Sequence, residues 1–225
     1  MTARDYVDVT YDESHHPFTP YPGQLTAHLV SRYGIQAGDH LLDVGCGRGE
    51  FLKGFIATGV QGYGTDQSPA AKRLCPDADI RVGNADDALP FDDEMFDVVF
   101  SKSVVEHFYY PERLIQDMYR VLKPGGLLIT MTPDWDTIYR MFYEDFTHRT
   151  PFTATSLREI QLVYGFEEIE VEKFRQLPQL WERERGVAFF AAEATRFLAP
   201  RRLKPRSKWV RFSKELMLLS SARKP

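Results

Sequence analysis

The chain has 225 residues, 43% of them hydrophobic, which is enough for one domain of ordinary size with its own core. No run of about 18 apolar residues occurs, and the N-terminal stretch MTARDYVDVTYDESHH is acidic and polar, so we expect neither a membrane span nor a secretory signal and assign the protein to the cytoplasm. The formal net charge is -4, but residues 1–185 sum to -12 and residues 186–225 to +8. An acidic body argues against a nucleic-acid surface, and only the last part of the chain favours an anionic partner.

Apolar runs and amphipathic stretches alternate along the first 132 residues. Runs typical of strands fall at residues 40–45, 62–66, 79–83, 96–102 and 127–132. Helical patterns lie between and before them, at residues 25–33, 50–59, 68–75 and 111–122. Strict alternation of strand and helix predicts an α/β fold, a doubly wound and mostly parallel sheet of the Rossmann-like kind, with helices on both faces. Ligands of such sheets bind at the carboxyl ends of the strands, where Asp43, Asp66, Asn84 and Ser101 fall.

The alternation breaks after residue 132. Residues 133–156 are aromatic and turn-rich, about as long as loops that carry function, and we expect them to form a lid over the acceptor. Residues 157–166 restore a helix, and residues 167–174 alternate like an edge strand. The predicted organisation is an N-terminal arm over the site (1–24), a catalytic domain (25–185) and a basic amphipathic helical tail (186–225).

Three glycines follow the first predicted strand. The stretch LLDVGCGRGEFL supplies a tight turn at Gly45, close backbone approach at Gly47, and close packing or helix entry at Gly49. Asp66 closes the next strand, where a carboxylate can accept hydrogen bonds from both hydroxyls of a ribose. Asn84 follows the third strand and can read the amino edge of an adenine. A nucleoside cofactor can therefore lie against bare main chain at this edge.

Five segments together resemble the class I S-adenosylmethionine-dependent methyltransferases across roughly residues 25–170. These are LLDVGCGRGEFL, GYGTDQS, GNADDALPF, FDVVFSKSVVEH and VLKPGGLLITMTP. The resemblance implies S-adenosyl-L-methionine as the cofactor. It implies roles in binding that cofactor for Asp43, Gly45, Gly47, Gly49, Asp66, Gln67, Asn84, Ala85 and Ser101. The family more often has Asp where this chain has Asn84, so we expect weaker charge assistance at the adenine but no loss of binding.

Methyl transfer to a hydroxyl needs a group that removes its proton. His148, in YEDFTHRTPF, is the first candidate, because Asp145 can orient its ring and raise its basicity. His107, in SVVEH after the fourth strand, is the second. The alternatives are a loop histidine that only pairs inside the lid, and a Glu-His pair that only pins the next helix. A metal site could be assembled from His107, His148, Glu106 and Asp145, yet no i, i+4 histidine pair or cysteine pair supports it, so no metal is expected. Cys46 and Cys75 are expected to be reduced and structural.

Three features have competing interpretations: the lid aromatics, the N-terminal arm and the C-terminal tail. The lid aromatics could stack on a sugar, although the helical spacing of Trp135, Tyr139 and Phe142 favours ordinary packing. His15 and His16 lie in an N-terminal arm that either folds over the pocket or stays flexible. In the tail, Trp209, Phe212, Leu216 and Leu219 fall on one face of a predicted basic helix. Such a helix usually covers its own domain, but it can also contact an anionic membrane surface or a partner.

The resulting expectation is an O-methyltransferase that acts on a small-molecule or glycan hydroxyl. Segment YEDFTHRTPFTATSLREI resembles methyltransferases associated with bacterial polysaccharide functions, which makes sugar hydroxyls the first guess. N- or C-methylation of a small metabolite and a non-catalytic S-adenosylmethionine-binding module remain as alternatives, and a dehydrogenase stays formally open. Nucleic-acid methylation is disfavoured, because the fourth strand ends in SKSVVEH and not in a proline-proline-aromatic signature.

Overall fold

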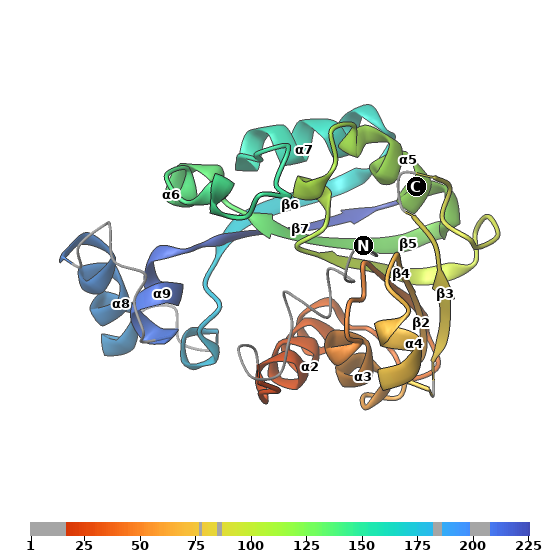
Figure 1. The fold of residues 1–225 in the computed structure, drawn as a ribbon, viewed down its shortest axis with the longest axis horizontal. Helices are drawn as coiled ribbons and strands as arrows, with labels where there is room; N and C mark the ends of the chain where they lie inside the picture. Colours follow the sequence, from red (N-terminus) through yellow and green to blue (C-terminus); the bar gives the residue numbers. More distant parts are fainter. Residues whose placement is uncertain (1–16, 77, 85–86, 182–185, 199–207) are drawn as a thin grey trace, which may run out of the picture.

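One seven-stranded sheet organises the molecule (Figure 1). The computed structural model describes residues 17–76, 78–84, 87–181, 186–198 and 208–225. The strand order is β3-β2-β1-β4-β5-β7-β6, and the strands are β1 (His40–Val44), β2 (Gln61–Asp66), β3 (Asp79–Val82), β4 (Phe96–Lys102), β5 (Leu122–Pro133), β6 (Glu167–Phe174) and β7 (Met217–Arg223). The first five strands pair in parallel, and β7 is antiparallel to both β5 and β6. The predicted Rossmann-like sheet is confirmed.

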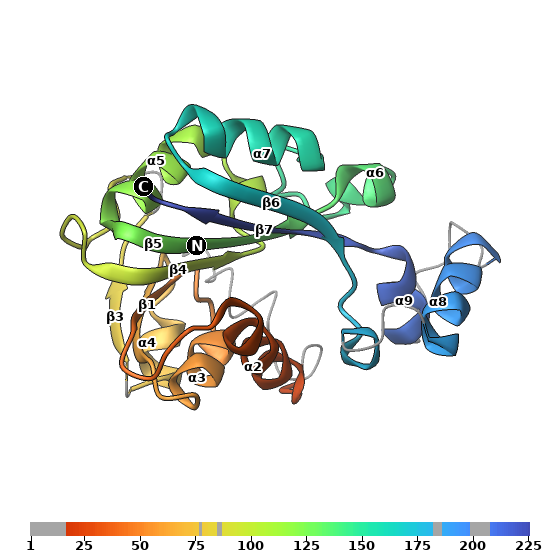
Figure 2. The same cartoon turned by 180° about the vertical axis from the view of Figure 1, so that it is seen from behind.

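Helices cover both faces of this sheet (Figures 1 and 2). One layer holds α2 (Tyr21–Tyr33), α3 (Glu50–Ile56) and α4 (Ala70–Leu74), and the other holds α5 (Pro111–Val121) and α7 (Ala154–Val163). Shorter helical segments are η1 (Val105–His107), α6 (Trp135–Ile138), η2 (Phe142–Glu144) and η3 (Pro178–Leu180). The remaining helices, α8 (Val187–Leu198) and α9 (Lys208–Lys214), project from one end of the sheet. Right-handed crossovers between parallel strands produce this two-layer cover.

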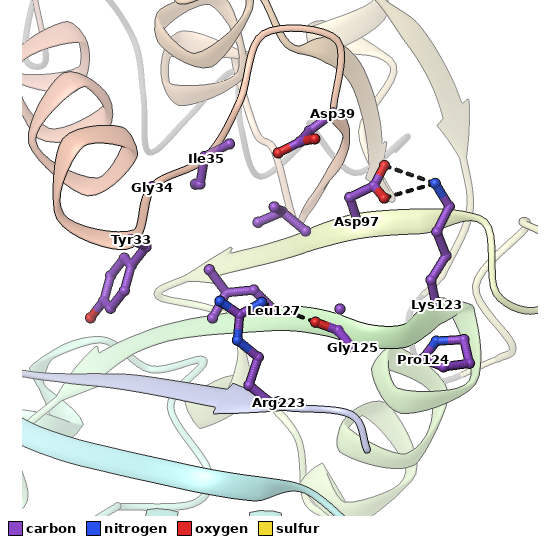
Figure 3. A pocket seen from close by; sticks show the side chains of 12 residues that line it. Tyr33, Gly34, Ile35, Asp39, Asp97, Lys123, Pro124, Gly125, Leu127 and Arg223 are labelled. Carbon is purple, nitrogen blue, oxygen red and sulfur yellow. Dashed lines mark hydrogen bonds and ion pairs between the residues drawn. The ribbon is translucent and has the colours of Figure 1, made fainter.

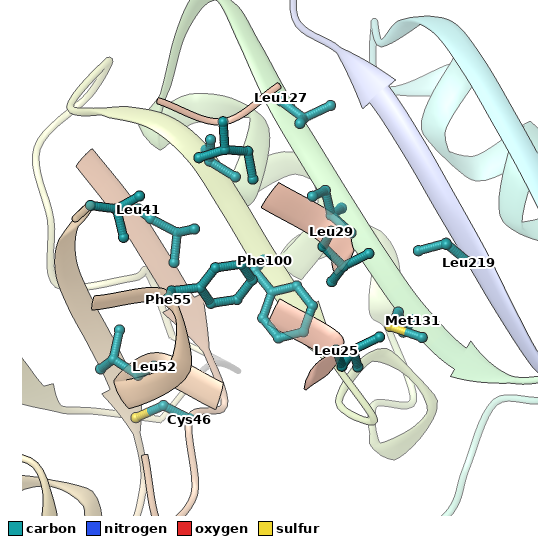
Figure 4. Packing of buried hydrophobic residues seen from close by; sticks show 14 of the residues in the cluster. Leu25, Leu29, Leu41, Cys46, Leu52, Phe55, Phe100, Leu127, Met131 and Leu219 are labelled. Carbon is teal, nitrogen blue, oxygen red and sulfur yellow. The ribbon is translucent and has the colours of Figure 1, made fainter. Parts of the chain in front are cut away.

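The core alternates between the two faces with the period of a strand. In β4, Phe100 packs against Phe55 of α3 at 5.0 Å between ring centroids, on the face that Leu25 and Leu29 of α2 cover (Figure 4). The neighbouring Val99 points the other way, toward the cluster that contains Ile115 of α5. Successive side chains leave a strand on opposite faces, so a nearly apolar strand needs both layers. The apolar run at 127–132 predicts the same for β5, and its residues are buried on both faces of the sheet.

The last strand corrects the predicted tail. Residues 186–225 are not a helical extension throughout, because Met217–Arg223 forms β7 inside the sheet. Leu219 pairs in register with Met131 of β5 and with Glu172 of β6, so it does not share a helix face with Trp209. The domain predicted to end at residue 185 therefore also includes β7. A short apolar run directly after a helix carries no periodicity that separates strand from helix, which is why the pattern misled.

The amino ends of the parallel strands carry a small cavity of about 230 Å³ (Figure 3). Lys123 Nζ lies 2.8 Å from both carboxylate oxygens of Asp97 there, and Arg223 donates to the carbonyl oxygen of Gly125. These contacts tie β4, β5 and β7 together at the edge opposite the predicted cofactor site. The polar residues at this edge have partners, which is typical of a structural closure.

Candidate functional site

The larger cavity lies at the carboxyl ends of β1, β2 and β4 and has a volume of about 530 Å³. Its lining comes from the glycine turn, the end of β2, the start of the loop after β3, the segment from β4 into η1, and the lid. The lining residues are Gly45, Cys46, Gly47, Arg48, Glu50, Phe51, Thr65, Asp66, Gln67, Gly83, Asn84, Lys102, Ser103, Val104, His107, Phe108, Phe146, Thr147 and Arg149. A cavity of this size suits a nucleoside cofactor or a small acceptor.

The three glycines of the turn have different structural roles. All have positive φ, 73° at Gly45, 54° at Gly47 and 74° at Gly49. A Cβ at Gly45 would lie 2.4 Å from Val104 Cγ2, and one at Gly49 would lie 3.0 Å from Cys75 Cβ. A Cβ at Gly47 would meet nothing within 4 Å. Gly45 and Gly49 are thus required by packing, whereas Gly47 keeps the main chain open toward the cavity.

Asp66 holds the turn in shape. Its Oδ2 accepts a hydrogen bond of 2.8 Å from the amide of Gly47, and its Oδ1 accepts one of 2.8 Å from the amide of Ser68. Each carboxylate oxygen has a second lone pair, so a ribose hydroxyl can be bound in addition. Gln67 and Asn84 line the same cavity. Ala85 lies outside the described residues.

Two predicted cofactor residues lie beneath the cavity and do not line it. Asp43 is 2% exposed, and its Oδ2 has no hydrogen-bond partner in the described part of the chain. Burial, followed by the charge of Asp66, raises the pKa of Asp43 well above its usual range. Ser101 is also buried with an unpaired hydroxyl, and Ser103, at φ 58°, lines the cavity in its place. A bound ammonium group would satisfy the Asp43 oxygen, so the site fits the methionine amino group of the cofactor.

The acceptor side is assembled from two segments about 40 residues apart in sequence. η1 carries His107 and the lid carries His148, and their ring centroids lie 4.9 Å apart. His107 Nδ1 is 2.9 Å from Thr147 Oγ1, which in turn donates to Asp145 Oδ1 at 2.5 Å. His148 Nε2 lies 4.0 Å from Asp145 Oδ2. The structure therefore brings together all three predicted catalytic residues, and Thr147 is the link that the sequence did not reveal.

The hydrogen bonds assign the tautomers of the two rings. Because the single proton of Thr147 Oγ1 goes to Asp145, His107 Nδ1 must donate to Thr147 and Nε2 keeps its lone pair. His148 Nδ1 lies 2.6 Å from the carbonyl oxygen of Phe142, which can only accept, so its Nδ1 also carries the proton. Burial, followed by the neighbouring His148, lowers the pKa of His107. His107 lines the cavity as a neutral base, whereas His148 stands behind it.

The buried carboxyl group of Glu106 and the amine of Lys102, which lines the cavity, were not predicted as part of the site. Burial raises the pKa of Glu106 to about 7 and lowers the pKa of Lys102 to about 8, and each group's charge partly offsets the shift of the other. Glu106 Oε2 accepts from Thr132 Oγ1 at 2.9 Å, and its Oε1 has no partner among the described residues. Lysine at the end of an apolar strand is the one sequence signal that pointed here.

Within the described residues, Glu106, His107 and His148 each offer a ligand atom, and these atoms lie within 4.8 Å of one another. One carboxylate and two imidazoles are a donor set that divalent metals accept. Both imidazoles also donate their Nδ1 proton to an oxygen, as metal-bound histidines commonly do. A metal site at these three residues is therefore the alternative to the prediction of no metal, and the spacing of the residues in the sequence did not indicate it.

The lid aromatics separate into a packed and an exposed group. Phe142 and Phe152 are buried, and Trp135 contacts Phe142 at 5.5 Å between centroids. Tyr143 and Phe146 are exposed, and Phe146 lines the cavity. In the N-terminal arm, the Phe18 ring lies 4.3 Å from the guanidinium of Arg48 in the glycine turn. His15 and His16 lie outside the described residues.

With this geometry in view, the central part of the chain can be compared with known proteins. Residues 42–130 match the family model described as a methyltransferase domain. An "uncharacterized methyltransferase" of Mycolicibacterium vanbaalenii is 42% identical over 105 residues, which is 44% of this chain and 41% of that protein. A "probable S-adenosylmethionine-dependent methyltransferase" of Mycolicibacterium smegmatis is 33% identical over 142 residues, 58% of this chain and 53% of that protein. The chain spans about half the length of the curated relatives it matches.

Solved structures agree on the fold. A methyltransferase in complex with the Haloferax volcanii Trm112 methyltransferase activator aligns over 100% of both chains, with a TM-score of 0.74 and 22% identity. A Haemonchus contortus phosphoethanolamine N-methyltransferase bound to S-adenosyl-L-methionine covers 89% of this chain and 52% of its own, with a TM-score of 0.64 and 20% identity. In the described residues, no helix has the length and apolarity needed to cross a bilayer.

Proposed function

We infer that residues 42–130 form a methyltransferase domain that uses S-adenosylmethionine, and this is the premise for the activity of the whole chain. We propose that the chain methylates a hydroxyl group of a small molecule or a sugar, with His107 as the base and Thr147 and Asp145 as the groups that orient it. The observation that carries the proposal is the position of His107, which lines the same cavity as the glycine turn while Thr147, itself bonded to Asp145, holds its Nδ1. An activity in bacterial polysaccharide synthesis in the cytoplasm is the setting we infer for it.

When bound, S-adenosylmethionine supplies a methyl group on a positively charged sulfur. The part of His107 is to accept the hydroxyl proton at Nε2 while the acceptor oxygen bonds to the methyl carbon. Its Nδ1 proton, held by Thr147, keeps the ring oriented, and the carboxylate of Asp145 stabilises the imidazolium that forms. Partial burial raises the pKa of Asp145, but the hydrogen bonds from Thr147 lower it by more. The net pKa of Asp145 is therefore lowered, and this group stays ionised. His148 supports the ring of His107 from behind and is no longer the first candidate for the base.

The test begins with calorimetry of the purified full chain with S-adenosylhomocysteine. Release of S-adenosylhomocysteine is then followed with a panel of hydroxylated sugars and small phenols. His107→Ala is expected to lower kcat by about 10² to 10⁴ if that ring takes the proton. His40→Ala, which removes a histidine in tilted ring contact with Tyr63 at the start of β1, is the matched control and should leave kcat unchanged. If His107→Ala keeps full turnover, the acceptor atom is a nitrogen or carbon. Cofactor binding without turnover on any acceptor would indicate a binding module.

A divalent cation on Glu106, His107 and His148 is the second candidate for activating the hydroxyl, favoured by the donor set of this cluster. There, the three residues would hold the ion and the ion would lower the pKa of a bound hydroxyl. Dialysis against EDTA separates the two versions. Turnover that survives EDTA assigns the proton to His107, and turnover that is lost and then restored by Mg²⁺, Mn²⁺ or Zn²⁺ assigns the cluster to a metal.

A further inference from the structure

The α8–α9 unit lies at the end of the molecule farthest from α4 (Figures 1 and 2). Its helix α8 exposes an apolar stripe there. The inner face of α8 is packed, with Ala192 fully buried in a cluster that includes Leu177, Leu180, Trp209 and Phe212. The outer face carries Val187, Phe190, Phe197 and Leu198, with exposed fractions of 87%, 65%, 76% and 82%. Residues at these spacings share one side of a helix. Ordinary packing on the domain therefore accounts for one face of α8 only.

The sequence that follows this stripe carries charge of one sign. From Arg196 to Lys214 the sequence holds eight lysines and arginines and no aspartate or glutamate. The two acidic residues that flank this basic segment are engaged, Glu193 with Arg175 and Glu215 with Arg211 at 2.7 Å. The remainder of the chain is acidic. A stripe of large apolar side chains that is followed in the sequence by a dense basic segment is the pattern of helices that lie in the interface of an anionic membrane.

The same features disfavour a second copy of the chain as the occupant. Four partly exposed side chains offer on the order of 500 Å² of apolar surface, below the roughly 800 Å² per partner of a standard protein interface. A symmetric pair would also bring two basic segments together, and like charges across an interface oppose association. We propose that the exposed stripe of α8 docks this chain on the surface of a bilayer that contains anionic phospholipid, and that the basic residues following it in the sequence supply the attraction. This surface contact is independent of the reaction at the cavity.

Vesicle flotation with the full chain tests the proposal. Vesicles of phosphatidylcholine with about 30% phosphatidylglycerol should carry the wild-type protein, and pure phosphatidylcholine vesicles should carry at least tenfold less. Raising the salt from about 50 to 500 mM should release most of the protein, because the attraction to anionic lipid is screened. The double substitution Phe190→Ser with Phe197→Ser keeps every charge and should lower binding about tenfold or more. Val163→Ser, at a residue of α7 that is 76% exposed, is the matched control and should bind like the wild type.

Two measurements decide against the proposal. Absence of wild-type flotation on anionic vesicles, or equal flotation of the double variant, overturns it. Sedimentation equilibrium without lipid gives the competing assignment: a dimer that the double variant loses, together with no vesicle binding, would make a second copy the occupant. Circular dichroism of each variant checks that the fold is intact, and a double variant that does not fold is replaced by Val187→Ser with Leu198→Ser on the same stripe.

Discussion

The cofactor side and the acceptor side of the cavity are built from different kinds of atoms. On the cofactor side, main-chain atoms of the glycine turn face the cavity, and Asp66 holds this turn by accepting hydrogen bonds from the amides of Gly47 and Ser68. The acceptor side is side chain, with His107 from η1 joined through Thr147 to Asp145 of the lid. The first is local and can be written as a motif of neighbouring residues. The second exists only after segments 40 residues apart have met, so changes on the two sides should have separable effects.

Removing the carboxylate of Asp66 is the most severe way to break the cofactor side. Asp66→Ala deletes two hydrogen bonds to a charged acceptor and frees the Gly47 amide, so we expect the affinity for S-adenosylhomocysteine to fall by about 100-fold. Asp39→Ala is the control, because Asp39 accepts from the amide of Gln36 at 2.8 Å in a comparable turn at the opposite end of β1. Calorimetry on both variants makes the comparison. Equal losses would mean that Asp66 acts only through stability.

A single methyl group tests whether the open face of Gly47 belongs to the cofactor. Gly47→Ala should lower the free energy of unfolding by about 1 kcal/mol, because the residue has a positive φ. The added methyl group should also weaken cofactor binding about 30-fold by filling part of the cavity. Gly34→Ala has a similar φ of 66° and open space around it, so it should show the stability loss alone. Urea denaturation and calorimetry measure the two effects. Unchanged affinity of Gly47→Ala would disconnect the turn from the ligand.

Thr147→Val sharpens the acceptor side while leaving the cofactor side untouched. Without the hydroxyl, the Nδ1 proton of His107 loses its acceptor, and we expect kcat to fall about tenfold with little change in cofactor affinity. The wild-type rate should fall as pH drops through the pKa of His107, which burial holds below 6.5, and the variant should move this acid limb to still lower pH because the imidazolium is less stabilised. Thr150→Val removes a comparable hydrogen bond, to the carbonyl oxygen of Phe108, and should leave the limb in place.

The smallest expected effect is a pH-dependent change in stability at Glu106. Its folded pKa of about 7 lies above the usual 4.5, so folding favours the protonated acid. That contribution is fully present below pH 4.5 and is lost as the pH rises through 7. Glu106→Gln should therefore be about 1 kcal/mol more stable than the wild type at pH 8 and no more stable at pH 4.5. Glu159→Gln, on the exposed face of α7, should show no difference at either pH. A Glu106→Gln gain that is equal at both values would contradict the assignment.

The sequence predicted the strands of the sheet where apolar runs alternate with helical patterns. It failed where a short apolar run follows a helix directly, because such a run could be either helix or strand. Strand β4 was predicted with its observed bounds, because Phe96–Lys102 is bounded by turn residues. β7 was missed, because LMLL follows α9 with no glycine or proline between them. The cofactor residues could be proposed from a local motif, whereas Thr147 and Lys102 depend on how the lid and β4 meet in three dimensions. No pattern within one segment contains that information.

Strand β7 has a consequence for how the chain acquires its fold. It lies between β5 and β6, although more than 80 residues of chain separate it from β5 and more than 40 from β6. Until Met217–Arg223 arrives, β5 and β6 cannot pair directly, and each keeps an open edge of unsatisfied amides and carbonyls. The growing polypeptide thus has an unpaired edge on β5 while α8 and α9 are still being synthesised. A chaperone that shields β5 during synthesis should raise the yield of native protein more than one that acts after release.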